Sequence, residues 1–231
     1  MKRQIRRWHI YPDANDLAAH AANAILRAAD EAIRVRGRFT VVLAGGTTPQ
    51  QVYARLATAR ADWGRWYVYF SDERSVPVGD AERNDRRAYE AWLNHVPVPR
   101  DQVWRIPGEL GPEAGAQRYA AVVAPLDQFD LVLLGLGEDG HVASLFPDLW
   151  RSGDSDDVVG VRGAPKPPPE RISLGAARLS RARQVLFLVA GESKRRAIAA
   201  WRRGDDIPAA SVVPEAGVDV LVDAAAWPDP L

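Results

Sequence analysis

The clearest chemical signal in this 231-residue chain is a histidine that follows a glycine-rich segment. Residues 129–134 read FDLVLL, which is typical of a buried strand, and GLGEDGH follows directly at 135–141. Histidine titrates near neutral pH, so His141 at the carboxyl end of a strand is a candidate general base. Asp139 is placed to orient or polarise its imidazole. The remaining histidines are expected to be structural or solvated: His9, His20 and His95.

The same glycines resemble the start of a dinucleotide-binding fingerprint. However, the third glycine, Gly140, falls two residues later than that pattern requires. The histidine and Pro147 that follow do not suit a dinucleotide-binding helix either. We therefore reject a dinucleotide cofactor at this segment.

A second glycine loop, AGGTTP at 44–49, connects a predicted strand to a helix that we expect to begin at Pro49. Glycine backbone can approach a ligand closely, and the free N–H groups at a helix start favour a phosphate. An ordinary tight turn capped by Thr48 explains the same residues, so the loop alone does not establish a phosphate site. The candidate phosphate-binding residues of this loop are Gly45, Gly46, Thr47 and Thr48.

Charged residues follow another predicted strand, where 71–77 reads SDERSVP. Asp72 and Arg74 would lie at the carboxyl end of a parallel strand, where open α/β sheets bind ligands. A solvated turn is the alternative. Later in the chain, Arg171 and Lys194 can reach a phosphate as charge-assisted donors, or they are ordinary surface cations, and composition does not choose between these roles.

Short apolar strands alternate with amphipathic helices along the chain. Strands are predicted at 39–43, 67–70, 129–134, 185–190 and 218–222, and helices at 16–35, 49–56, 84–93, 112–123 and 192–202. Nearly continuous apolar strands indicate a parallel sheet that is covered on both faces. The expected fold is therefore α/β, a three-layer α/β/α arrangement with a Rossmann-like, mostly parallel sheet. The charged, proline-rich stretch 152–170 is interpreted as a surface loop, which leaves one domain over 1–231.

The bulk composition narrows the classes of function. Thirty basic and thirty acidic side chains cancel, so no broad positive field is present to bind nucleic acid. The chain has no cysteine, which excludes disulfides, thiolate metal sites and cysteine nucleophiles. No apolar run approaches the length of a membrane span, and the N-terminus lacks the pattern of a secretory signal. We expect a cytoplasmic protein with no membrane or nucleic-acid partner.

Taken together, the three motifs resemble the 6-phosphogluconolactonase family, within a larger group that includes glucosamine-6-phosphate deaminase. Residues 44–49 look like its phosphate loop, 72–77 like its acidic turn and 135–147 like its glycine-histidine signature. The resemblance implies hydrolysis of 6-phosphoglucono-δ-lactone to 6-phosphogluconate in the pentose phosphate pathway, without a metal or organic cofactor. His141 would then deprotonate the attacking water, and Arg74 would contribute positive charge. Asp139 and Asp72 complete the catalytic group, and the phosphate would be bound by Gly45, Gly46, Thr47, Thr48, Arg171 and Lys194.

Two other functions fit the sequence less well. Deaminases of the group carry Asn-Glu-Pro after the shared histidine region, whereas this chain has Leu145-Phe146-Pro147 and lacks that acid. A non-catalytic sugar-phosphate sensor domain is disfavoured because no helix-turn-helix or basic patch is visible. The expected partner is a small sugar-phosphate lactone, and the expected assembly is a monomer or a weak homo-oligomer.

Overall fold

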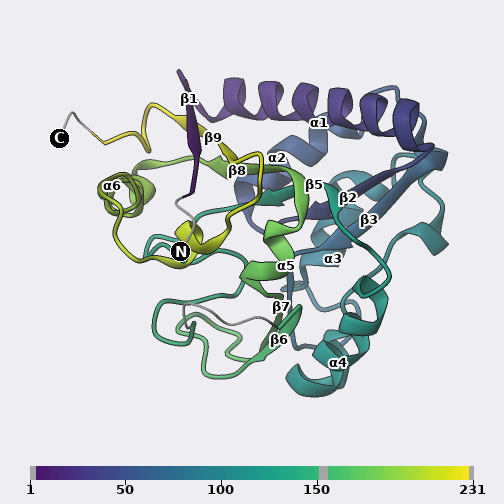
Figure 1. Cartoon of the computed structure of the whole chain (residues 1–231). Helices are drawn as coiled ribbons and strands as arrows, with labels where there is room; N and C mark the ends of the chain where they lie inside the picture. The colour runs from purple at the N-terminus through teal and green to yellow at the C-terminus, as the bar shows by residue number, and fades with distance from the viewer. Residues whose placement is uncertain (1–3, 151–155, 229–231) are drawn as a thin grey trace.

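Parallel strands form the central sheet of the computed structural model, which describes residues 4–150 and 156–228 (Figure 1). Its strands are β1 (Arg6–Tyr11), β2 (Phe39–Leu43), β3 (Trp66–Phe70), β5 (Phe129–Leu134), β8 (Ala182–Val189) and β9 (Val218–Asp223). Their order is β1-β9-β8-β5-β2-β3, and every neighbouring pair is parallel. All residues of β2 and β5 are buried, because the sheet is covered on both faces. The predicted α/β class is confirmed.

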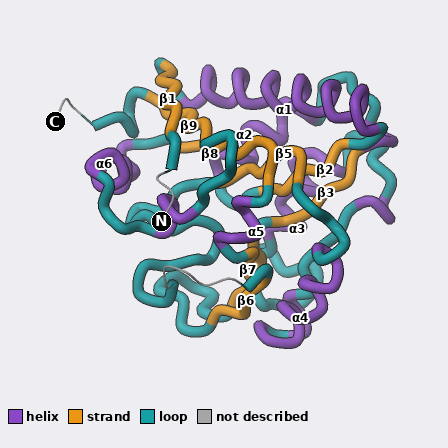
Figure 2. The backbone as a smooth tube through the Cα atoms, in the orientation of Figure 1, coloured by secondary structure: helices purple, strands orange, loops and turns teal. Residues whose placement is uncertain are grey.

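Helices flank this sheet: α1 (Ala14–Arg36), α2 (Thr47–Leu56), α3 (Asn84–Ala88), α4 (Pro112–Val123), α5 (Ala176–Ser180) and α6 (Arg195–Arg203). Figure 2 shows α1 above the sheet and α5 below it. Helix α1 starts where the Asp13 carboxylate accepts a hydrogen bond from the N–H of Asp16 at 2.8 Å. It ends at Gly37, whose φ of 73° is the left-handed conformation of a glycine C-cap.

Two predicted helices are divided in the structure. The helix expected at 84–93 is α3 followed by a π-helical turn, Tyr89–Leu93. The helix expected at 192–202 begins with a 3₁₀ turn, Glu192–Lys194, before α6. In both cases the chain is helical as predicted, but the type of helical hydrogen bond changes along it. Amphipathic spacing does not distinguish these types of hydrogen bond.

A second, smaller sheet was not predicted. It consists of β4 (Asp72–Arg74), β7 (Arg171–Leu174) and β6 (Val158–Val161), paired antiparallel in that order. The alternative of a solvated turn is therefore wrong for residues 72–74, and the surface-loop prediction is wrong at 158–161. Residues 152–155 of that predicted loop lie outside the described residues. Strands of three or four residues are too short to show a period of two, so their partners alone reveal them.

The two sheets meet at Ser71, directly after β3. Its N–H donates to the carbonyl of Leu43 at 2.8 Å, and its own carbonyl accepts from the N–H of Leu174 at 2.7 Å. In Figure 1 the small sheet lies beneath the central one, next to α4. The chain segments after β2, β3, β5 and β8 consequently converge at one edge, where β7 closes the lower side.

Candidate active site

One cavity of about 280 Å³ lies at the carboxyl edge of the central sheet. Its wall combines the loop after β2, the junction of β3 with β4, the loop after β5, the turn from β6 to β7, and the segment after β8. Among the described residues, seven of the selected candidates line it: Gly45, Gly46, Asp72, Arg74, His141, Arg171 and Lys194. The others, Asp139, Thr47 and Thr48, are not among the lining residues.

His141 and Asp139 form a close pair at this cavity. The distance from His141 Nδ1 to Asp139 Oδ1 is 2.6 Å, and the backbone N–H of His141 also donates to Oδ1 at 3.1 Å. Burial acts to raise the pKa of Asp139, but the hydrogen bond and charge of His141 outweigh it and lower that pKa to about 2. An ionised carboxylate only accepts, so Nδ1 carries the proton and Nε2 is left as the basic nitrogen.

Two glycines shape the loop that carries this histidine. A Cβ atom on Gly137 would lie 1.9 Å from His141 Nδ1, so no larger residue fits beneath the ring. Gly140 has φ of 87°, a conformation that glycine readily adopts, and a Cβ there would lie 2.9 Å from Ile207. On its other side the imidazole lies 4.6 Å from the ring of Phe146, measured between centroids. Its side chain is 17% exposed, which leaves it reachable from the cavity.

The glycine loop after β2 leads into α2 earlier than predicted. The helix begins at Thr47, with Gly46 as the N-cap, and not at Pro49 with Thr48 as the cap. Gly46 takes φ of 103° and ψ of 170°, a conformation that glycine readily supplies at the cap. Thr47 and Thr48 therefore lie in the first helical turn, where their backbone N–H groups have no intrahelical partner.

Asp72 is buried at the cavity wall and held by three donors. Its carboxylate accepts from Ser144 Oγ at 2.6 Å, from Asn84 Nδ2 at 3.2 Å and from Ser71 Oγ at 3.2 Å. These donors come from three separate segments, so Asp72 ties the loop after β5 to β4 and α3. Sequence reasoning missed the role of Ser144, because nothing in its own segment indicates a partner 72 positions away.

Arg74 and Glu73 alternate across β4. Arg74 lines the cavity, and its guanidinium donates to the carbonyl of Glu82. Glu73 points the other way and is fully buried. Its carboxylate accepts from the backbone N–H groups of Arg74, Asn84 and Asp85 at 2.7–2.9 Å. Burial raises the pKa of Glu73 to about 7 against the effect of these three bonds.

The lower wall carries Arg171, Lys194 and a residue that sequence reasoning missed, Lys166. Lys194 is partly buried where it lines the cavity, and this burial lowers the pKa of its ammonium group. The chain has only three lysines among its 30 basic residues, and two of them, Lys166 and Lys194, line this cavity. The rarity of lysine in this sequence is the one feature that could have indicated Lys166 as a candidate site residue.

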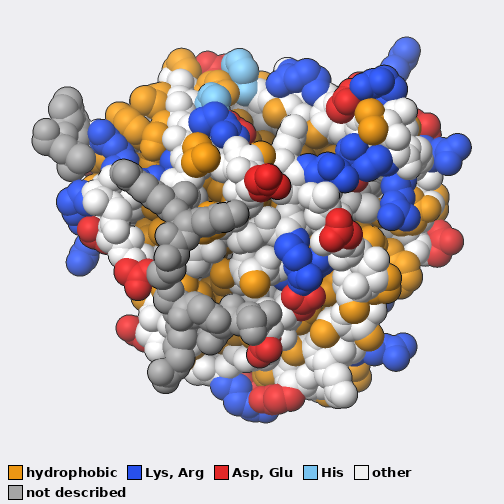
Figure 3. Space-filling view, in the orientation of Figure 1, with side chains coloured by type: hydrophobic (Ala, Val, Ile, Leu, Met, Phe, Trp, Pro, Cys, Tyr) orange, Lys and Arg blue, Asp and Glu red, His pale blue; other side chains and the backbone are white. Residues whose placement is uncertain are grey.

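Other features of the described residues bear on partners. No group of three histidine, aspartate or glutamate side chains there is placed to hold a metal ion. No described helix has the length and apolarity needed to span a membrane. Figure 3 shows acidic and basic side chains interspersed over the visible face.

Comparison with known proteins identifies close relatives. Residues 12–221 match the family described as glucosamine-6-phosphate isomerases/6-phosphogluconolactonase. The chain is 37% identical over 223 residues to the 6-phosphogluconolactonase of Mycobacterium leprae, covering 90% of this chain and 89% of the relative. It is also 37% identical to that of Streptomyces coelicolor over 239 residues, covering 94% and 92%.

Solved structures agree with this. The crystal structure of 6-phosphogluconolactonase from Thermotoga maritima has a TM-score of 0.88 and 27% identity, covering 95% of this chain and all of that one. A monomeric glucosamine-6-phosphate deaminase matches with a TM-score of 0.82 at 21% identity, covering 95% and 98%. At that identity the likeness to the deaminase concerns the fold alone.

Proposed function

Because this chain belongs to the glucosamine-6-phosphate isomerase/6-phosphogluconolactonase family, we propose that it hydrolyses 6-phospho-D-glucono-1,5-lactone to 6-phosphogluconate, with His141 as the general base. This is the lactone-hydrolysing step of the pentose phosphate pathway. The observation that carries the proposed mechanism is that His141, which is paired with Asp139, and the glycine loop before α2 border the same cavity.

The chemistry follows from the protonation of the pair. His141 Nε2 takes a proton from water as the water oxygen attacks C1 of the lactone, and Asp139 stabilises the imidazolium that forms. Positive charge from Arg74 stabilises the oxyanion on C1. The bond from C1 to the ring oxygen then breaks, and the ring oxygen accepts a proton from the imidazolium. The products are the open-chain hydroxyl and a carboxylic acid, which ionises.

Asp72 has a different role in this proposal. An ionised carboxylate offers about four acceptor sites, and three donors already occupy Asp72. We assign it to orienting a substrate hydroxyl with the remaining site rather than to proton transfer. The deaminase reaction needs a further acid after the histidine region, where this chain has Phe146, and no ammonia release from glucosamine 6-phosphate is expected.

The phosphate is assigned to the start of α2 and the lower wall. The free backbone N–H groups at Gly46, Thr47 and Thr48 provide donors and the positive end of the helix dipole, and Pro49 has no N–H to compete. Gly45 lets this loop pack against the Asn84 amide, because a Cβ on Gly45 would lie 2.2 Å from Asn84 Oδ1. Lys194 and Arg171 add positive charge to the same cavity.

The test is the hydrolysis of freshly prepared lactone above its spontaneous rate. We expect His141→Ala to lower kcat by about 10²- to 10⁴-fold, the usual contribution of a general base. The matched control is His95→Ala, because His95 is exposed and bonds only locally, to the carbonyl of Glu90 at 3.0 Å. A His141→Ala enzyme that keeps the parent rate would remove the mechanism. A cytoplasmic location, a single domain and a monomeric or weakly associated state stay predictions.

A further inference from the structure

Lys166 contributes an unassigned positive charge to the cavity. Among its described lining residues the cations are Arg74, Lys166, Arg171 and Lys194, and Asp72 is the one carboxylate. Within the described residues, the Lys166 ammonium has no ion pair or hydrogen bond, whereas Arg74 is bonded to Glu82. A wall with this excess of positive charge is suited to an anion.

Arg171 uses its donors elsewhere. Its guanidinium donates through Nη2 to the carbonyls of Lys166 at 3.0 Å and Pro167 at 3.2 Å, and through Nε to that of Pro168 at 3.2 Å. The side chain is buried, and its Cζ lies 5.6 Å from the centre of the Phe146 ring. One arginine thus donates to three consecutive carbonyls of one turn. These bonds leave fewer of its N–H groups free to bind a ligand.

The held turn is stiff by composition. Residues 165–169 read PKPPP, so four of five residues have a fixed φ and no N–H. Such a segment has almost no donors of its own, and its carbonyls depend on donors from elsewhere. Arg171 supplies them, and the N–H of Ala164 closes the turn on the carbonyl of Pro169 at 2.9 Å. The result is a preorganised support for one lysine at the mouth of the cavity.

We propose that Lys166 is a ligand of the substrate's phosphate and that Arg171 is a positioning residue that holds Lys166 over the cavity. This rests on the proposed function, since the phosphate is the one charged group of the lactone. It changes the role that family resemblance implies for Arg171, from direct ligand to support of the turn. The phosphate then lies between Lys166, Lys194 and the start of α2.

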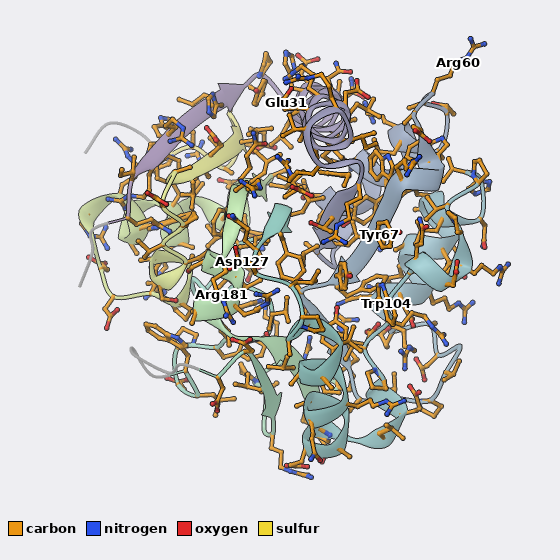
Figure 4. All side chains as sticks on the ribbon, turned by 45° about the vertical axis from the view of Figure 1, so that its right-hand side comes forward. Glu31, Arg60, Tyr67, Trp104, Asp127 and Arg181 are labelled. Carbon is orange, nitrogen blue, oxygen red and sulfur yellow. The ribbon has the colours of Figure 1, made fainter. Side chains whose placement is uncertain are left out.

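The first experiment compares Lys166→Met with the parent enzyme on two substrates. Loss of a charge-assisted hydrogen bond should raise KM for the phosphorylated lactone by about tenfold or more, with kcat within about threefold. Hydrolysis of unphosphorylated glucono-1,5-lactone should not change. The control Arg60→Met removes a positive charge that projects into solvent away from the cavity, as Figure 4 shows, and should match the parent. An unchanged KM, or an equal loss on both lactones, would overturn the proposal.

The second experiment separates support from binding at Arg171. Arg171→Lys keeps the charge but replaces the planar fork of Nε and Nη2 donors with a single ammonium group, which does not reproduce the three bonds, so KM should rise as it does in Lys166→Met. If Arg171 acts through Lys166, the double variant should be no worse than Lys166→Met alone, whereas a direct phosphate ligand would give multiplied effects. Multiplied effects therefore refute the positioning role. Thermal unfolding of each variant confirms that it is folded.

A binding measurement keeps this inference apart from the proposed reaction. Inorganic phosphate is titrated into the parent and into Lys166→Met by calorimetry, in the absence of lactone. The proposal predicts binding to the parent that weakens about tenfold in the variant. Equal affinity for both proteins would refute it, even if the lactone is hydrolysed. A parent that binds phosphate but leaves the lactone unhydrolysed would refute the proposed function alone.

Discussion

Gly137 allows a direct test of how closely His141 must be placed. In Gly137→Ala the new methyl carbon would lie 1.9 Å from Nδ1 and 2.3 Å from Cε1 of the imidazole. Non-bonded carbon and nitrogen atoms need about 3.5 Å, so the ring must move by roughly 1.6 Å. That movement breaks the 2.6 Å bond to Asp139. Since a misplacement of about 1 Å costs about 10²-fold in rate, we expect kcat to fall at least a hundredfold.

The backbone itself tolerates this change. Gly137 is not among the residues with positive φ, so alanine can adopt its conformation, and the loss should not come from unfolding. Gly64→Ala is the control, because Gly64 does not line the cavity and has no positive φ, and a methyl there meets only Asp62 Oδ1, at 3.8 Å. The assay is kcat at saturating lactone, with thermal unfolding of each protein. A folded Gly137→Ala enzyme within threefold of the parent, or an equal loss in Gly64→Ala, would refute the reasoning.

Two further predictions concern carboxylates. Asp139→Asn removes the negative charge beside His141. Because the Asp139 side chain is 38% exposed, we expect kcat to fall by only about tenfold while KM stays unchanged. A change confined to KM would contradict the role of Asp139 in supporting the general base. Burial raises the pKa of Glu73 from 4.5 to about 7, so the folded protein keeps this carboxyl protonated to a higher pH than the unfolded chain does. The free energy of unfolding should therefore fall by up to about 3 kcal/mol as the pH rises from 4.5 to 7. Denaturant unfolding across that pH range should show this fall in the free energy of unfolding for the parent but not for Glu73→Gln. Parallel pH profiles for the two proteins would exclude a contribution from Glu73.

The sequence predicted most elements of the central sheet because they are locally encoded. The strands at 39–43 and 129–134 and the helix at 112–123 have the bounds that the structure shows. Each carries its signal in its own residues, as a short apolar run or as helical spacing. Strand β1 was missed, since its sequence RRWHIY lies at the edge of the sheet and is mostly not buried. An edge strand has no reason to be continuously apolar.

The candidate site residues were also predicted from patterns within a few residues of the chain. These patterns located the segments at the cavity but not every detail of their conformation. A glycine loop before a helix and a histidine after a strand are patterns within a few residues, so Gly45, Gly46 and His141 were found in segments that border the cavity. The exact start of α2 was not found, because the cap depends on the backbone angles of Gly46. Those angles are not visible in the residue type alone.

By itself, then, the sequence determined most strands of the central sheet, the longer helices, and which of these elements carry glycine, histidine and charge at their ends. Only the tertiary structure decided which distant groups meet: Ser144 with Asp72, and Arg171 with the proline turn of Lys166. Spacing along a chain reports which face of an element is apolar, whereas a hydrogen-bond partner depends on the whole path of the chain. For that reason the sequence does not distinguish Arg171 from an ordinary surface cation. In the fold, its guanidinium donates to three carbonyls of the proline turn.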